Sequence, residues 1–467
     1  MNSLSLIRNL QIFIGVYFVL LHAFYAILSL AAFWFMRKHY FEREARYFPP
    51  LYTEEVPPIS FLVPAYNEEK IILSTLYSLL QIEYTHFEVI LINDGSTDAT
   101  LETLKNVLDL KKINLALPNT LRTKSIQGIY QSSKYESVWL IDKQQGGKSD
   151  ALNAGILLSH YPLFCSMDAD SVLSRKNINE TVQPFLENPH TVVAGGLVNV
   201  ANGCKVKDGF LAEYRLPKSI LALFQLVEYL RAFLLGRVGF STINALLIVS
   251  GAFGIFKKQA VLDVGGYNPK TVGEDMELVL RLHKHLLLNQ IPYNITLVPQ
   301  PVCWTEVPED LKTLKNQRIR WQRGLAEALF FNIKLLFHPR SGVVGWVIFP
   351  FFLFFEFLGP CIELLGYVLF ASSFALGWIT PTAFFSFFVV AVSTGLLLSS
   401  LSLLLQELSF SHYTRSKNIL ILFCISILEN LGFRQLISFF RFIGILQWLF
   451  GKKSPWGQMK RQGNWAS

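Results

Sequence analysis

Long apolar runs near both ends of the chain constrain its fold more than any other feature. The first, Leu10 to Met36, has about 27 residues, enough for a helix to cross a hydrocarbon layer of about 30 Å with some tilt. Two further runs cover about 343–370 and 376–405, and a fourth covers 419–450. Only 16% of the 467 residues are charged, whereas a soluble domain has about 25%. Part of this chain is therefore expected to lie in lipid.

Basic residues predict the orientation of these runs, because lysine and arginine concentrate on the cytoplasmic side of membrane spans. The first run is too long for a signal peptide and lacks a small-residue cleavage site. Four basic residues follow it: Arg37, Lys38, Arg43 and Arg46. Basic residues also flank the fourth run: Arg415, Lys417, Lys452, Lys453, Lys460 and Arg461. We therefore expect a multi-pass protein of the inner or plasma membrane whose middle part and C-terminus are cytoplasmic.

The fourth apolar run carries three charges, Glu429, Arg434 and Arg441. Its length fits either a helical hairpin or one span followed by a helix in the membrane plane. Charged side chains at membrane depth usually face protein or a water-filled path. We therefore expect these three side chains to point away from lipid.

Composition argues against two other classes of function. The net charge of +8 is explained by basic residues at the edges of apolar runs. No basic motif interleaved with aromatic residues indicates a nucleic-acid partner. The five cysteines form no CxxC pair, so we expect buried small apolar residues rather than disulfides or zinc ligands.

The middle of the chain has a different pattern from its ends. Prolines at 49, 50, 57 and 58 mark an extended linker. Short β-rich runs then alternate with helical stretches, which favours an α/β domain with a mainly parallel sheet. The predicted strands are Ile59–Val63, Val89–Ile92, Val138–Ile141, Leu163–Met167 and Val192–Val200. The predicted helices between them are Glu69–Leu80, Asp98–Leu108, Ser149–Leu158 and Arg175–Leu186.

An amphipathic helix is predicted after Pro308. Apolar residues recur there at helical spacing: Leu311, Leu314, Trp321, Leu325, Leu329, Ile333 and Leu336. Basic residues line another face: Lys312, Lys315, Arg320 and Arg323. Such a helix suits the cytoplasmic surface of a membrane, and burial against the soluble domain is the alternative.

Polar clusters follow the predicted strands, where ligands bind in open α/β sheets. Pro64 to Glu68 ends the first strand and Asn93 to Ser96 the second. Carboxylates there can accept hydrogen bonds from a ribose and a base edge. In a third cluster, glycines let the backbone approach a ligand while Lys148 offers a point charge to a diphosphate. A Walker A loop would need glycine at position 142, which is Asp142, so that motif is excluded.

Two carboxylates, Asp168 and Asp170, follow the predicted strand Leu163–Met167. Residues two apart on an extended chain point to the same side, so both carboxylates can converge on one cation. Hard oxygen ligands together with a substrate diphosphate suit Mg²⁺ or Mn²⁺. The cluster therefore predicts a divalent metal site at a strand end.

Two later clusters add an acid pair and an aromatic. Glu274 and Asp275 open a predicted helix, Glu274–His285, whose N-terminus keeps a carboxylate ionised; an ordinary helix-start preference is the alternative. In the segment QRIRW, Trp321 can stack on the apolar face of a pyranose, and Arg320 can hold a diphosphate bidentately.

In this order the clusters FLVPAYNE, NDGSTD, GKSDALN, DAD, GED and QRIRW resemble the family 2 glycosyltransferases. The likeness is to the membrane-embedded, processive members, such as the hyaluronan, cellulose and poly-N-acetylglucosamine synthases. It covers about Ile59 to Gly324 and implies a cytoplasmic GT-A domain, Rossmann-like, with transmembrane and interface helices. One departure is Gly273, where the family usually has threonine.

The resemblance also implies roles for individual residues. The donor site would comprise Pro64, Tyr66, Glu68, Asp94, Lys148, Asn153 and Asp168, with Tyr66, Glu68 and Asp94 around the uridine. Asp170 would bind the metal and Asp168 would be shared between metal and nucleotide. Asp275, next to Glu274, would be the general base. The acceptor path and diphosphate contacts would comprise Ser250, Gly251, Gln317, Arg320 and Trp321.

The implied activity is that of a hexosyltransferase that inverts the anomeric centre and depends on Mg²⁺ or Mn²⁺. It would move a sugar from a UDP-sugar, UDP-glucose or UDP-N-acetylglucosamine, to a growing β-linked polysaccharide that leaves through the C-terminal helices. One alternative is the addition of a single sugar to a lipid acceptor. Another is a catalytically silent membrane receptor or assembly subunit, against which the retained acidic residues count.

Four parts of the chain follow from these patterns. Residues 1–48 form a transmembrane helix and basic linker, 49–307 the GT-A domain, 308–341 the interface helix, and 342–467 a transmembrane region. Only residues 451–467 follow the fourth apolar run, too few for a regulatory domain. A secretion or regulatory subunit would therefore be a separate chain.

Overall fold

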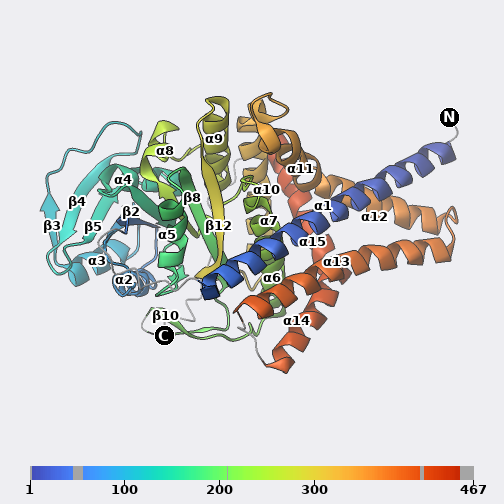
Figure 1. Cartoon of the computed structure of the whole chain (residues 1–467), viewed down its shortest axis with the longest axis horizontal. Coiled ribbons are helices and arrows are strands. Elements are labelled where there is room, and N and C mark those ends of the chain that lie inside the picture. The colour runs from blue at the N-terminus through green and yellow to red at the C-terminus, as the bar shows by residue number, and fades with distance from the viewer. Residues whose placement is uncertain (1–2, 46–55, 208, 411–414, 453–467) are drawn as a thin grey trace.

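The computed structural model describes residues 3–45, 56–207, 209–410 and 415–452. Figure 1 shows an α/β domain on one side and a group of long helices on the other, with α1 (Ser3–Ala45) running across them. The predicted α/β class is confirmed. The predicted linker residues Pro49 and Pro50 lie outside the described residues, as do four basic residues, Arg46, Lys453, Lys460 and Arg461.

Within the described residues, ten strands form one mixed sheet in the order β3-β4-β5-β2-β1-β6-β11-β8-β12-β7. Seven strands run in one direction, and β4, β7 and β11 run against them. Their bounds are β1 Ile59–Ala65, β2 Phe87–Asp94, β3 Leu110–Ile113, β4 Ile126–Ser132, β5 Val138–Lys143, β6 Leu163–Met167, β7 Val172–Leu173, β8 Thr191–Val200, β11 Phe253–Lys257 and β12 Asn294–Thr305. A separate antiparallel pair joins β9 (Lys205–Lys207) and β10 (Phe210–Glu213). All five predicted strands are present.

Helices of the α/β domain connect these strands. They are α2 Ile72–Leu80, α3 Thr100–Leu108, α4 Lys148–Leu158, α5 Ile178–Glu187, α8 Lys258–Asp263 and α9 Glu274–Leu288. The predicted helices are confirmed with shifted starts, since α2 begins three residues later than expected. Because β5, β2, β1 and β6 are mutually parallel neighbours, their carboxyl ends lie along one edge of the sheet. The polar clusters therefore gather at that edge.

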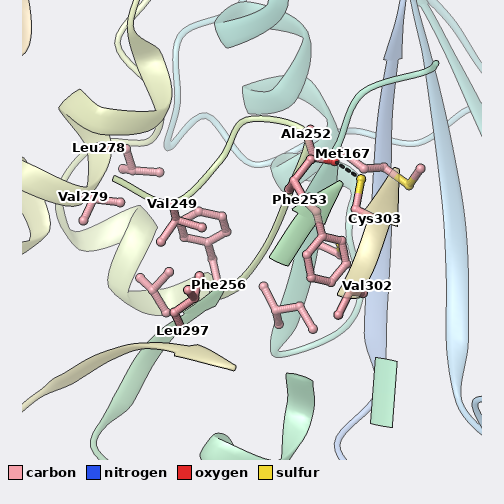
Figure 2. Close-up of a cluster of buried hydrophobic side chains, with 14 of the residues drawn as sticks. Met167, Val249, Ala252, Phe253, Phe256, Leu278, Val279, Leu297, Val302 and Cys303 are labelled. Atoms are coloured by element: carbon pink, nitrogen blue, oxygen red, sulfur yellow. Dashed lines mark hydrogen bonds between the residues drawn. The ribbon is translucent and has the colours of Figure 1, made fainter. Parts of the chain in front are cut away.

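An apolar core lies beside the strand that carries the carboxylate pair. Figure 2 shows Phe253 and Val302 side by side, with Cys303 next to Met167 and Ala252. Phe253 is completely buried, and burial of such a side chain contributes about 1.5–3 kcal/mol. The Sγ atom of Cys303 donates a weak hydrogen bond to the Ala252 carbonyl at 3.6 Å. This packing holds β6, β11 and β12 together next to the residues that follow β6.

The cysteine prediction is correct for three residues and wrong for one. Cys165, Cys204 and Cys303 are buried, Cys361 is half-buried, and Cys424 is exposed. Cys424 lies on the exposed face of α14 (Ser416–Leu428), an apolar helix.

The apolar helices agree in part with the predicted spans. Residues Ile7–Lys38 and Ser416–Leu449 are each long and apolar enough to cross a membrane. The run near 343–370 is not one straight helix: residues Val344–Phe357 and Gly359–Ala375 meet at a bend of 45°. Pro360 lies in the first turn of the second helix, where it cannot continue the preceding ladder of hydrogen bonds. These two helices provide a third possible span only if the bent pair is counted as a single span.

The fourth apolar run is two helices rather than one. The chain kinks between α14 and α15 (Arg434–Leu449), where Leu431 and Gly432 leave the helical conformation and Gly432 has φ 148°. Only glycine adopts such a backbone without strain. The kink separates the two helices, as Figure 1 shows.

The remaining helices link the two parts of the molecule. They are α6 Ile220–Leu230, the π-helical segment η1 Arg231–Arg237, α7 Val238–Ser241, α10 Leu311–Phe331, the short η2 Ile333–Leu335, the bent segments η3 Val344–Ile348, α11 Phe349–Phe351 and η4 Phe352–Phe357, α12 Gly359–Ala375, α13 Pro381–Phe410 and the kink segment η5 Glu429–Phe433. Helix α10, the predicted amphipathic helix, packs against α9 on one side and α15 on the other. It therefore lies between the sheet domain and the apolar helices.

Candidate active site

Hydrogen bonds tie the loops after β1 and β2 together. The side-chain oxygen of Asn67 accepts from the Thr97 amide at 2.8 Å, and the Asn67 amide donates to the hydroxyl of Ser96 at 3.0 Å. Asn67 has φ 58°, a left-handed conformation that asparagine tolerates better than most residues. Tyr66 and Glu68 flank Asn67, so this cross-link fixes their backbone next to the end of β2. Pro64 is half-buried within β1 itself.

Asp94 is the last residue of β2 and is buried. Its Oδ1 atom accepts from the Nζ of Lys143 at 2.6 Å and from the Gly146 amide at 2.9 Å. Its Oδ2 atom accepts from the Gly147 amide at 2.7 Å. A carboxylate has about four acceptor sites, so about one remains, on Oδ2. Asp94 thus holds the glycine loop and keeps one acceptor site for a ligand.

Lys148 joins four segments of the chain. Its ammonium donates to Asp168 Oδ1 at 2.5 Å and to the Gly251 carbonyl at 2.9 Å, and it lies 3.7 Å from Glu274 Oε1. Burial lowers the pKa of Lys148, but the charges of Asp168 and Glu274 outweigh that effect and leave the pKa above its usual value. The lysine is therefore held as a cation where the ends of β6, the start of α4 and the start of α9 meet.

The acid pair at the start of α9 lies against the same glycine. The Gly251 amide donates to Asp275 Oδ2 at 3.0 Å, and the Met276 amide donates to Asp275 Oδ1 at 2.8 Å. Burial raises the pKa of Glu274 above its usual value, with Lys148 acting in the opposite direction. Two amides thus fix the orientation of the Asp275 carboxylate. Ser250, the preceding residue, accepts a long hydrogen bond from the Ala252 amide at 3.4 Å.

The residues that follow β6 fit a divalent cation that a ligand completes. Asp168 is half-buried and Asp170 is buried, and both offer hard carboxylate oxygens. Among the described residues, no group of three or more His, Cys, Asp or Glu side chains is arranged to hold a metal. Mg²⁺ is commonly bound by one or two carboxylates plus substrate phosphates. The donor set therefore fits a metal held jointly with a diphosphate.

Helix α10 brings the QxxRW residues to this region. The backbones of Gly273 and Gly324 are in close contact: a Cβ built on Gly273 would lie 2.7 Å from the Cα of Gly324. Trp321 is 42% exposed and Gln317 is buried. The positive charge of Arg320 acts on the Glu274 carboxyl and lowers its pKa in part. The motif therefore lies beside the acid pair.

Asn153 has a different environment from the other predicted donor residues. It is buried in α4, its side-chain amide donates to the Tyr267 carbonyl at 2.9 Å, and its Oδ1 accepts from the Tyr267 amide at 2.7 Å. These paired hydrogen bonds fasten α4 to the loop before α9. Asn153 therefore acts on the site through the packing of α4.

Two residues of the site were missed by the sequence analysis, Lys143 and Arg318. Lys143 is completely buried and lies 2.6 Å from both Asp94 Oδ1 and Asp150 Oδ1. Arg318 donates to Glu228 at 2.7 Å, and its guanidinium lies 4.3 Å from the centre of the Trp321 ring, within the range of a cation–π contact. A signal for Lys143 exists in the sheet register, which aligns it with Asp94.

A cavity of about 320 Å³ lies among the apolar helices. It is lined by charged side chains from α6, η1, η4, α12, η5 and α15: Glu228, Arg231, Arg237, Glu356, Glu363, Glu429, Arg434 and Arg441. Arg231 pairs with Glu429 at 2.7 Å and Arg441 with Glu356 at 3.0 Å. The three predicted charges of the last run thus face a cavity, as expected from the cost of exposing them to lipid. Glu228 joins this cavity to Arg318 and Trp321.

Comparison with known proteins identifies related chains. The poly-beta-1,6-N-acetyl-D-glucosamine synthase of Staphylococcus aureus (strain COL) is 31% identical over 297 residues, which is 62% of this chain and 61% of that protein. The synthase of the same name from Staphylococcus epidermidis is 28% identical over 337 residues, 69% of this chain and 70% of that protein. The chain thus matches about three-fifths of the length of the first relative.

A solved structure and two family models complete the comparison. The mannosyltransferase PcManGT from Pyrobaculum calidifontis, in complex with GDP-Man and Mn²⁺, superposes with a TM-score of 0.51 at 18% identity, covering 89% of this chain and 99% of that one. This likeness of fold agrees with the predicted GT-A architecture. The model "Glycosyl transferase family 2" matches residues 60–207, and "Glycosyl transferase family group 2" matches 163–403, just over half of the chain. The chain therefore belongs to glycosyl transferase family group 2.

Proposed function

We propose that the protein transfers a sugar from a UDP-sugar to the end of a growing β-linked polysaccharide. The observation that carries this proposal is the unbroken line of contacts from Asp168 through Lys148 and Gly251 to Asp275. It brings a cation suited to a diphosphate and a carboxylate suited to act as a base to the same side of one glycine, since a Cβ on Gly251 would lie 3.0 Å from Lys148 Nζ and 3.4 Å from Asp275 Oδ2. The relatives named poly-beta-1,6-N-acetyl-D-glucosamine synthase favour UDP-N-acetylglucosamine as the first donor to test, ahead of UDP-glucose.

The donor nucleotide is proposed to bind at the carboxyl ends of β1 and β2. The remaining acceptor site on Asp94 Oδ2 accepts from the nucleoside, beside Tyr66 and Glu68. Lys148 and Arg320 face the diphosphate, where their positive charges would neutralise part of its negative charge. Lys148 exchanges its contact with Asp168 for a phosphate oxygen when the donor binds.

Asp168 and Asp170 would hold Mg²⁺ or Mn²⁺ together with that diphosphate. The ion supplies electrostatic neutralisation of the leaving UDP when it is bound. Asp170 is buried in the turn that follows β6, so the packing around this turn holds it in place. Asp168 is shared between the ion and Lys148.

The transfer is proposed to be a single displacement. Asp275 takes the proton of an acceptor hydroxyl as that oxygen forms a bond to the anomeric carbon. The bond from that carbon to the diphosphate breaks, and UDP leaves with the electron pair. Attack from the opposite face inverts the anomeric centre, so an α-linked donor gives a β-linked product. Trp321, partly exposed beside the acid pair, stacks on the terminal sugar of the acceptor.

Export of the polymer is proposed to pass through the charged cavity among the apolar helices. Its charged lining side chains suit a hydrated chain better than lipid. Glu228 links the cavity to the Arg318–Trp321 pair, so the acceptor end and the cavity are neighbours. Arg37 and Lys38 at the end of the first span, with Arg415 and Lys417 at the start of α14, support a cytoplasmic sheet domain.

The base assignment is tested with Asp275→Asn. General-base catalysis contributes about 10²–10⁴-fold, so kcat for UDP release should fall by at least about 10²-fold while UDP affinity stays within a few-fold. Asp263→Asn is the matched control, because Asp263 is an exposed aspartate on α8. Activity of Asp275→Asn within a few-fold of the wild type would contradict the assignment.

A further inference from the structure

Lys143 is a buried cation that the proposed reaction does not use directly. Its side chain has no exposed surface, and its ammonium lies 2.6 Å from Asp94 Oδ1 and 2.6 Å from Asp150 Oδ1. It also donates to the Gln144 carbonyl at 2.7 Å. A charge so deeply buried is costly unless it is paired. Lys143 and its two carboxylate partners therefore hold one another in position.

Both partners hold the loop that leads to Lys148. Asp94 accepts from the amides of Gly146 and Gly147. Asp150 accepts from the Lys124 amide at 3.1 Å through both of its oxygens, and a Cβ on Gly146 would lie 2.5 Å from the Asp150 carboxyl carbon. The loop is thus clamped between two carboxylates, with Lys143 as the positive charge between them.

We propose that Lys143 is a positioning residue for the nucleoside diphosphate. It keeps the Asp94 and Asp150 carboxylates from repelling each other, and so holds the Gly146–Lys148 loop in the conformation that presents Lys148 to the diphosphate. It also occupies one acceptor site of Asp94 Oδ1, which turns the open site on Oδ2 toward the ligand. The inference rests on the proposed function, because it concerns the donor of that same reaction.

The sheet register explains why this position carries a lysine. Strands β2 and β5 are parallel, and Asp94 is aligned with Lys143. Aligned residues on parallel neighbours point to the same face of a sheet, so the lysine reaches the carboxylate directly. A neutral residue at 143 would leave two carboxylates, each at most 10% exposed, without their shared counter-charge. Their repulsion would then open the loop.

The experiment measures UDP binding by calorimetry and UDP-sugar turnover for Lys143→Met in the full-length protein. The dissociation constant for UDP and the KM for the UDP-sugar should both rise by about tenfold or more. The kcat at saturating donor should change less, because Asp275 is held by Gly251 and Met276 instead. Lys111→Met is the matched control, since Lys111 is an exposed lysine on β3 of the same sheet.

A second variant keeps the proposal testable if Lys143→Met folds poorly. Lys143→Met combined with Asp150→Asn removes the repulsion, so the thermal unfolding midpoint and most of the UDP affinity lost in Lys143→Met should both recover. Wild-type UDP affinity in Lys143→Met, or no recovery of affinity in the double variant, would overturn the role of Lys143 and leave the proposed function standing. A wild-type protein that binds no UDP would overturn the proposed function and this inference together.

Discussion

Replacing Gly273 with alanine is expected to slow sugar transfer much more than it weakens the binding of the donor. Gly273 precedes the acid pair and touches Gly324 of α10: its Cβ would lie 2.7 Å from the Gly324 Cα, 2.9 Å from its carbonyl carbon and 3.0 Å from its oxygen. The contact is mutual, since a Cβ on Gly324 would lie 2.7 Å from the Gly273 Cα. Gly273 has φ −121°, so space rather than backbone conformation requires glycine here.

The size of the effect follows from these distances. Carbon atoms in contact normally lie about 3.5–4.0 Å apart, so α9 and α10 would have to separate by about 1 Å. Overpacking of this kind costs about 1–3 kcal/mol. The same shift moves the start of α9, which carries Asp275, relative to α10, and a misplacement of about 1 Å can cost about 10²-fold in rate.

The assay compares kcat for UDP release, UDP affinity and the thermal unfolding midpoint in detergent. For Gly273→Ala, kcat should fall by about 10- to 100-fold and the midpoint by several degrees. UDP affinity should change by only a few-fold, because Asp94 and Lys148 stay in place and Arg320 is the one proposed diphosphate contact on α10. Gly15→Ala is the control, because no atom lies within 4 Å of its Cβ. Adding Gly324→Ala to Gly273→Ala should lower the unfolding midpoint less than Gly324→Ala does alone, because the first substitution has already separated the two helices. Wild-type kcat and midpoint in Gly273→Ala would refute this reasoning.

Two further predictions concern buried charge. Burial lowers the pKa of His283 to about 4, whereas a histidine in the unfolded chain titrates near 6.5. The stability that neutral His283 contributes, on the order of 3 kcal/mol, should therefore be fully present above about pH 6.5 and be lost as the pH falls toward 4. The unfolding midpoint should therefore fall with acid less steeply in His283→Gln than in the wild type or in the exposed control His190→Gln; equal slopes would contradict the argument. Arg231 donates to both oxygens of Glu429, which is 3% exposed, so Arg231→Met should destabilise the protein by about 3–5 kcal/mol. Adding Glu429→Gln should recover most of the midpoint, and no recovery would show that the loss does not come from an unpaired carboxylate.

The sequence was sufficient where a local pattern alone decides the structure. Strand β6 was predicted with its observed bounds, because a mainly apolar run, interrupted only by Ser166, ends at the charged Asp168. Strand β12 was missed, because Pro299 and Pro301 argue against a strand. The structure accommodates them with shifts in the register against β8 around Val298 and Pro301, which only the neighbouring strand reveals.

Prediction of the site has the same limit. The clusters around Lys148, Asp168 and Asp275 meet as the strand order led us to expect. The role of Lys143 depends on the alignment of β5 with β2, and that of Arg318 on a partner 90 residues earlier in the chain. Such contacts leave no local signature, because each residue alone resembles an ordinary surface charge.

The apolar helices add a second lesson. Length and hydropathy identified two helices that could cross a membrane, or three if the bent pair is one span, but the bend near Leu358 and the kink at Gly432 are set by single residues within them. Both breaks lie in or next to segments that line the charged cavity. A run of apolar residues therefore predicts that a segment enters lipid, and it does not predict the path that the segment takes.

The central claim is tested most directly by UDP release from detergent-solubilised protein. A panel of UDP-sugars is supplied with Mn²⁺ or Mg²⁺ and again with EDTA, and the size of the product is measured in the same reactions. We predict release with one UDP-sugar, loss of release with EDTA, and a product of high mass. Release that stops at a single sugar on a lipid acceptor, or no release with any donor, would contradict the account.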